Sequence, residues 1–120
     1  MGAAGVGQLW IMVAGPYRSG AVNEAGRAAN LRALNAAALA VFRRGHIPVI
    51  GVNLALPIIE AAGADCFDEI MMPVSLAAAK RCDAVLRIGG PSGGADAEVA
   101  RFRARGLPVY DAIEEVPEAG

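Results

Sequence analysis

The sequence predicts an α/β protein in which one parallel sheet lies between helices, and three observations lead to this fold class. Short continuous apolar runs alternate along the chain with longer segments that are apolar at helical spacing. A helix end, a glycine and a proline-bearing strand recur almost unchanged, as FRRGHIPVI from Phe42 and FRARGLPVY from Phe102. The length of 120 residues suits one domain. We therefore expect a single three-layer domain over residues 1–120, with a doubly wound parallel sheet of flavodoxin or Rossmann-like type.

The first half of the chain contains two expected strands and two expected helices. The run LWIMVA over Leu9–Ala14 is typical of a strand that is buried on both faces. A long helix over Glu24–Arg44 follows, and it ends in basic residues and Gly45. His46–Val52 is expected to be the second strand and Leu54–Ala62 the second helix. The long helix is expected to pack through four apolar residues, Leu31, Leu34, Ala38 and Phe42.

The second half repeats this alternation. Its expected elements are a short helix over Ser75–Arg81 capped by Ser75, a strand over Ala84–Ile88, a helix over Ala95–Arg105 and a strand over Leu107–Tyr110. The stretch from Gly63 to Met72 has no clear pattern. Residues 111–120 are acidic and rich in turn formers, so we expect a partly frayed tail.

Composition and charge exclude several classes of function. With 11 basic and 12 acidic residues the net charge is −1, so there is no basic excess that would bind nucleic acid. Cys66 and Cys82 are too far apart for a metal knuckle and too few for a disulfide framework, which favours reduced thiols. No basic leader is present and no apolar run approaches the roughly 20 residues that cross a bilayer. We therefore expect a cytoplasmic protein without membrane contact. Every basic residue except Lys80 is arginine, a bias that suggests GC-rich coding and a bacterial source.

Two glycine-bearing loops follow expected strands, and the carboxyl ends of parallel strands meet at one edge of a sheet. In the loop GPYRSG, Gly15–Gly20, the glycines allow backbone N–H groups to approach an anion and Arg18 adds charged donors. In the loop GGPSGG, Gly89–Gly94, the Ser92 hydroxyl lies at the positive end of a helix dipole. Together the loops predict a phosphate site, although each alone is more often a plain structural turn. Neither matches the P-loop or the GxGxxG fingerprint, and no cofactor or metal is expected.

Glu98 lies one turn into the helix that the second loop opens. There the helix dipole favours an ionised carboxylate, which is the form that attacks a sugar carbon. The alternative is an exposed glutamate paired with Arg101 one turn further along. His46 is placed at the opposite end of its strand from these loops, and we interpret it as structural.

Four segments resemble the nucleoside 2-deoxyribosyltransferase-like superfamily, which includes small bacterial members and deoxynucleoside 5′-monophosphate N-glycosidases. They are GPYRSG after the first strand, a long helix ending in RRGH-PV, CDAVL, and PSGGADAEVARFRARGLPVY. The likeness covers almost the whole chain, and its most specific part is Ser92 followed six residues later by Glu98. The resemblance implies that Glu98 is the nucleophile at the anomeric carbon and that the two loops hold a 5′-phosphate. The site residues expected from the resemblance and the loops are Glu98 and Tyr17 as catalytic, and Gly15, Pro16, Arg18, Ser19, Gly20, Ser92, Gly93 and Gly94 as substrate-binding.

In one respect the sequence departs from this family. The family carries a second acid, an aspartate that begins the short helix before CDAVL, and the matching residue here is Ser75, which cannot act as a general acid at neutral pH. Asp83 is expected at the wrong edge of the sheet to replace it. Asp68, Glu69 or a group from a neighbouring subunit would have to do so, or the fold binds its ligand without efficient cleavage.

Two functions therefore stay open. One is cleavage or transfer of the N-glycosidic bond of a nucleoside or nucleoside 5′-monophosphate through Glu98. The other is a non-catalytic nucleotide-binding or sensing module. A scaffold that only assembles is a third interpretation.

The apolar share of the sequence also predicts self-association. A domain of this size buries only roughly 65% of the surface of its unfolded chain, yet 55% of the residues are apolar. We expect a homodimer or higher homo-oligomer that completes the site and buries apolar surface from the stretch between Leu54 and Met72. The residues expected there are Leu56, Ile58, Ile59, Ile70, Met71 and Met72.

Overall fold

The computed structural model describes residues 6–120, and it contains one sheet of four parallel strands. The strands are β1 (Trp10–Ala14), β2 (Ile47–Val49), β3 (Ala84–Arg87) and β4 (Val109–Tyr110), in the order β2-β1-β3-β4. From β1 the chain goes to β2 on one side and then returns to place β3 on the other side. The strand order therefore reverses between β1 and β3, which is the place where open parallel sheets bind ligands. Residues 1–5 of the predicted domain lie outside the described part.

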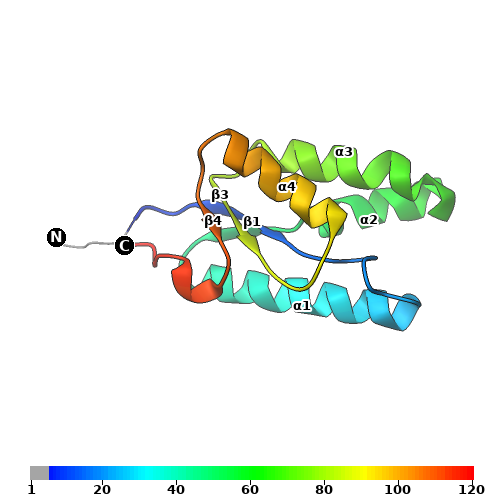
Figure 1. Cartoon of the computed structure of the whole chain (residues 1–120), viewed down its shortest axis with the longest axis horizontal. Helices are drawn as coiled ribbons and strands as arrows, with labels where there is room; N and C mark the ends of the chain where they lie inside the picture. Colours follow the sequence, from blue (N-terminus) through cyan, green and yellow to red (C-terminus); the bar gives the residue numbers. More distant parts are fainter. Residues whose placement is uncertain (1–5) are drawn as a thin grey trace.

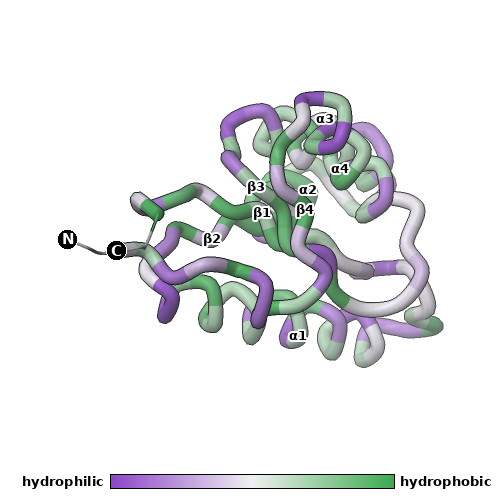
Figure 2. Tube along the Cα trace, turned by 60° about the vertical axis from the view of Figure 1, so that its left-hand side comes forward, coloured by the Kyte–Doolittle hydropathy of each residue, from purple (hydrophilic) through white to green (hydrophobic). Residues whose placement is uncertain are grey.

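Helices cover both faces of the sheet, which confirms the predicted three-layer α/β fold. In Figure 1, α1 (Glu24–Arg43) lies below the sheet, and α2 (Gly51–Ala62), α3 (Phe67–Ala79) and α4 (Gly93–Ala104) lie above it. The central strands are strongly hydrophobic (Figure 2) because both of their faces are buried. Alternate residues of β1 enter different layers: Ile11 and Val13 pack with Leu34 of α1, whereas Met12 packs with Phe102 of α4.

Helix α1 begins at an Asn23 cap, whose side chain accepts a hydrogen bond from the Gly26 N–H at 2.9 Å. Leu34 and Val41 form its buried face, with Leu31 and Ala38 partly buried beside them. The expected packing through Phe42 is wrong, because this side chain is 60% exposed. Leu34 and Val41 are seven residues apart, nearly two full turns, so they share one face, and Phe42 lies about 100° further round.

Helices α2 and α3 differ most from the sequence prediction. Helix α2 begins at Gly51, so β2 ends well before the expected Val52. Helix α3 starts at Phe67, inside the stretch without a clear pattern, and the prediction that Ser75 caps a helix is wrong because Ser75 lies buried in the middle of α3. Both helices contain an interior proline, Pro57 in α2 and Pro73 in α3. Proline is unfavourable in a helix interior because it lacks an N–H group, yet both helices continue through it.

Residues 111–120 pack against the domain, where we expected a partly frayed tail. Val116 is buried with Leu34 and Val41 in the layer below the sheet. The Arg44 guanidinium donates to the Val116 carbonyl at 2.9 Å, and the Ala119 N–H donates to the Arg44 carbonyl at 2.8 Å. Burial of one apolar side chain and these hydrogen bonds hold a segment whose composition alone is typical of a loop.

The buried His46 joins this segment to β1. Its Nδ1 accepts a hydrogen bond from the Leu9 N–H at 3.0 Å, so Nε2 carries the proton and donates to the Pro117 carbonyl at 2.6 Å. These contacts lie at the amino ends of the strands, far from the glycine loops, and they support the structural interpretation of His46.

In the stretch from Leu54 to Met72, which we expected at a subunit interface, some apolar residues are buried in the core and others are exposed. Ile59 and Met71 are buried where α2 packs on α3, whereas Leu54 and Ile58 stay about half exposed on α2. Association of subunits remains a prediction. Among residues 6–120, none of the helices combines the length and the apolar character needed to cross a bilayer.

Two leucines of α1 test this packing. Leu34 is 1% exposed and Leu39 is 51% exposed. We expect Leu34→Ala to lower the free energy of unfolding by about 2–5 kcal/mol, because it leaves a cavity against β1. The matched Leu39→Ala should stay within about 0.5 kcal/mol of the parent protein in urea unfolding. Equal losses at both positions would contradict the described orientation of α1.

Candidate functional site

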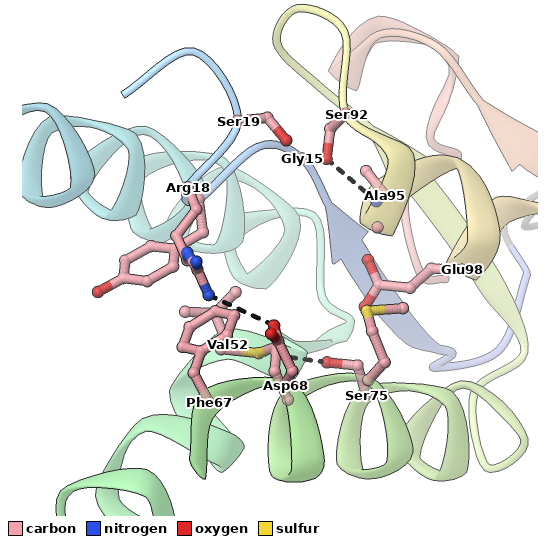
Figure 3. A pocket seen from close by; sticks show the side chains of 14 residues that line it. Gly15, Arg18, Ser19, Val52, Phe67, Asp68, Ser75, Ser92, Ala95 and Glu98 are labelled. Carbon is pink, nitrogen blue, oxygen red and sulfur yellow. Dashed lines mark hydrogen bonds and ion pairs between the residues drawn. The ribbon is translucent and has the colours of Figure 1, made fainter. Parts of the chain in front are cut away.

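A pocket of about 410 Å³ opens at the carboxyl ends of β1 and β3, where the strand order reverses. Five segments form its walls: the loops after β1 and β3, the start of α2, one face of α3, and the first turns of α4 (Figure 3). The lining residues are Gly15, Tyr17, Arg18, Ser19, Val52, Phe67, Asp68, Met71, Met72, Ser75, Ser92, Gly94, Ala95 and Glu98. The pocket therefore lies where the sequence places the two glycine loops.

Most of the predicted site residues meet in this pocket. Those that line it are Gly15, Tyr17, Arg18, Ser19, Ser92, Gly94 and Glu98. Pro16, Gly20 and Gly93 do not line it. Pro16 instead packs against Gly89 of the other loop, where an added Cβ would lie 2.7 Å from the proline Cδ. Gly20 has a φ of +74° and serves the turn, and Gly93 opens α4.

Gly15 allows the two loops to approach each other. A Cβ at this position would lie 2.8 Å from Cγ1 of Ile88 and 3.0 Å from its carbonyl oxygen. These separations are too short for any side chain, so the backbone after β1 can run against the backbone after β3 only with glycine there. Gly15 itself lines the pocket.

Arg87, which the sequence analysis did not single out, organises the second loop from the end of β3. Its guanidinium donates to the carbonyls of Ile88 and Gly90, the latter at 2.9 Å, and forms an ion pair with Asp96 of α4 at 3.2 Å. A single cation therefore ties the loop to the first turn of the helix that follows it. The signal in the sequence is a basic residue that ends an otherwise apolar strand.

Ser92 is the N-cap of α4, because its Oγ accepts a hydrogen bond from the Ala95 N–H at 3.2 Å (Figure 3). This bond uses an oxygen lone pair and leaves the hydroxyl hydrogen able to donate. The N–H groups of Gly93 and Gly94, at the start of α4, also have no partner within their own helix. Hydrogen-bond donors therefore gather at this end of the pocket.

Glu98 lies on α4 at the inner end of the pocket, and its side chain extends toward Ser75 of α3 (Figure 3). The residue is only 7% exposed, which contradicts the alternative of an exposed glutamate beside Arg101. Burial raises the pKa of Glu98 from 4.5 to about 7, while the hydrogen bond with Ser75 and the positive charge of Arg87 act in the opposite direction. Desolvation therefore outweighs the helix dipole, which we expected to favour the ionised carboxylate.

Three helices meet around this carboxyl group. Ser75 of α3 is buried beside it, and its Oγ lies 3.9 Å from Sδ of Met71. Gly51 begins α2, and a Cβ there would overlap Ser75 Oγ and lie 3.1 Å from Glu98 Oε2. The absence of a side chain at Gly51 is thus what allows α2, α3 and α4 to close around the carboxyl group.

The opposite end of the pocket is aromatic and charged. The Arg18 guanidinium lies over the Phe67 ring, 4.1 Å from its centre, and pairs with Asp68 at 3.5 Å. The Tyr17 and Phe67 rings are nearly parallel, with their centres 6.3 Å apart. Phe67 was missed by the sequence analysis because it falls in the stretch without a clear pattern.

The acidic residues considered as replacements for the missing acid are separated by the structure. Asp68 lines the pocket, whereas Glu69 is exposed outside it. Asp83 accepts a hydrogen bond from the Trp10 N–H at 2.8 Å, at the amino end of β1, which places it at the far edge of the sheet as expected. Within residues 6–120, no three His, Cys, Asp or Glu side chains gather in a way that could hold a metal ion.

Comparison with models of protein families and with curated proteins finds no match to this chain. Function must therefore be inferred from the chemistry of the pocket itself.

The raised pKa of Glu98 predicts a pH dependence of stability. Because the folded-state pKa lies above the unfolded value, the folded protein binds this proton more tightly. The free energy of unfolding should fall as pH rises from about 4.5 to about 7, by about 3 kcal/mol in all. Glu98→Gln should remove this loss. In urea unfolding, the free energy of unfolding of the variant should therefore rise relative to that of the parent protein between pH 4.5 and pH 8.

The exposed Glu69→Gln is the matched control and should follow the pH profile of the parent protein. A difference between Glu98→Gln and the parent that is the same at every pH would show that the folded protein does not hold a proton at Glu98.

Proposed function

We propose that the protein cleaves or transfers the N-glycosidic bond of a nucleoside or nucleoside 5′-monophosphate, with Glu98 as the nucleophile. The observation that carries this proposal is a buried carboxyl group at the inner end of a pocket whose other walls offer anion donors and an aromatic ring. A lone buried carboxyl group is costly to the fold, and groups of this kind are concentrated at functional sites.

In the proposed reaction an Oε atom of ionised Glu98 forms a bond to the anomeric carbon of the sugar. The bond from that carbon to the base breaks, and its electron pair leaves with the base, which takes up a proton from solvent water. Water, or the nitrogen of a second base, then attacks the same carbon and releases the Glu98 carboxylate. Hydrolysis and transfer differ only in this last nucleophile.

The surroundings of Glu98 favour such a step. Val52, Met71 and Met72 add apolar surface to the same pocket, and Glu98 itself is buried. A carboxylate that is poorly solvated is more basic and closer to its reactive state than one in water. Positive charge that develops on the sugar is stabilised strongly by this carboxylate, since the local dielectric constant is low.

A 5′-phosphate fits the hydrogen-bond donors of the loop after β3 and of the start of α4. The Ser92 hydroxyl and the free N–H groups of the first turn of α4, including that of Gly94, point to an anion site at the helix N-terminus. Arg18 can add a charged contact, because its present partner Asp68 is exposed and such ion pairs are weak.

A second candidate, a binding or sensing module without turnover, is favoured by one observation. Ser75 occupies the place where a general acid is expected, and among the described lining residues Asp68 is the only other carboxylate. Without a proton donor, departure of a neutral base is slowed by a factor of about 10²–10⁴.

Base release separates the two candidates. Purified protein incubated with a panel of deoxynucleosides and their 5′-monophosphates should liberate free base, detected by chromatography. Glu98→Gln should abolish the release, while Glu69→Gln should not change it. Because the nucleophile must be ionised, kcat/KM should rise with pH up to about 7 and then level off. Saturable binding without base release would favour the sensing module.

Arg18 tests the phosphate site. A charge-assisted hydrogen bond contributes about 1.5–3 kcal/mol, so Arg18→Ala should reduce the preference for a monophosphate over its nucleoside by about ten-fold or more. Titration calorimetry of both ligands measures this preference, and the exposed Arg32→Ala serves as the matched control. An unchanged preference would place the phosphate away from Arg18.

A further inference from the structure

Arg18 covers an aromatic surface inside the pocket. Its planar guanidinium lies over the ring of Phe67, the first residue of α3, with 4.1 Å between the guanidinium carbon and the ring centre (Figure 3). This is a stacking separation, and a flat organic ring can occupy the same place. Both side chains line the pocket that holds Glu98.

We propose that the Phe67 ring is the stacking surface for the base of the ligand, and that Arg18 covers it until a phosphate group draws the guanidinium away. This inference rests on the proposed function, and it names a residue and a coupling that the proposed function does not contain.

The contacts that hold Arg18 over the ring are weak ones. The side chains of Arg18 and Asp68 are 52% and 95% exposed, so water competes for their ion pair. A phosphate group at the N-terminus of α4 carries more charge than Asp68 and offers two oxygens to the guanidinium in a fork geometry. Binding of phosphate should therefore shift Arg18 from Asp68 and Phe67 to the anion.

The uncovered ring has surroundings that suit a nucleobase. The Tyr17 ring lies nearly parallel to it, and Met71 and Met72 add apolar surface along the same pocket. Stacking on an aromatic side chain accepts any base, because every base has a flat π-face. Asp68, once released by Arg18, offers a carboxylate close by to accept a hydrogen bond from an amino group of the base.

This arrangement couples the two halves of a nucleotide. A base that binds without phosphate must first displace Arg18, whereas a base that arrives with phosphate finds the ring free. By linkage, phosphate should tighten base binding, and a base should tighten phosphate binding by the same factor. The pocket would thus select phosphorylated nucleotides over nucleosides and free bases.

Adenine and inorganic phosphate test the coupling with wild-type protein, because neither probe contains a glycosidic bond. In titration calorimetry we expect saturating phosphate to tighten adenine binding about five-fold. Arg18→Ala should bind adenine without phosphate as tightly as the wild-type protein does with it, and should no longer respond to phosphate. Arg32→Ala, an exposed arginine of α1, is the matched control and should behave as the wild type.

Phe67 is tested by substitution with leucine. Phe67→Leu should weaken adenine binding about ten-fold and leave phosphate binding unchanged. Phe42→Leu, at an exposed position of α1, is the matched control. The Arg18→Ala measurement does not depend on this variant, since Arg18 is exposed, and it decides the coupling even if Phe67→Leu fails to fold.

The outcomes separate this inference from the proposed function. If wild-type protein releases base from nucleotides but phosphate leaves adenine affinity unchanged, or Phe67→Leu binds adenine normally, only the inference is overturned. If the wild type binds neither probe and releases no base, the proposed function fails and the inference fails with it.

Discussion

The burial of one carboxyl group, that of Glu98, is the constraint on which the pocket depends. Helix α4 carries the group, α3 places Ser75 against it, and α2 can approach only because Gly51 has no side chain. The protonation of Glu98 is therefore set by how three helices pack, and the charge of Arg87 only moderates it. A shift of any of these helices would admit water to the carboxyl group, so packing and chemistry at this end of the pocket cannot be changed separately.

Arg87 extends this control to the loop after β3. It gathers the carbonyls of Ile88 and Gly90 and holds Asp96 on α4, so the loop after β3 is bonded to the helix that bears Glu98. Ser92 strengthens the same connection as the N-cap. The donors for an anion and the proposed nucleophile therefore belong to one hydrogen-bonded unit. Arg18, on the loop after β1, is an exposed side chain that lines the same pocket.

Apolar runs predicted β1 and β3, and helical periodicity predicted α1 and α4. Ser92 and Glu98, which the resemblance singles out, both line the pocket. The start of α3 lies in the stretch from Gly63 to Met72 that has no clear pattern, so Ser75 was wrongly predicted as a cap and Phe67 was missed. Two properties could not follow from the sequence. The burial of Glu98 depends on which helix covers it, and the role of Arg87 depends on carbonyls that are presented only by the folded loop.

The hydrogen bonds of His46 and Asp83 and the anchoring of residues 111–120 all lie at the amino ends of the strands, whereas the pocket lies at the carboxyl ends. The residues that would determine any ligand preference and the contacts that hold the chain ends thus lie at opposite ends of the strands. Substitutions of Arg18, Phe67 or Asp68 could therefore change the pocket without weakening the contacts of His46 and of residues 111–120. A protein so divided is well suited to diversification, since a change of specificity and a loss of fold require different substitutions.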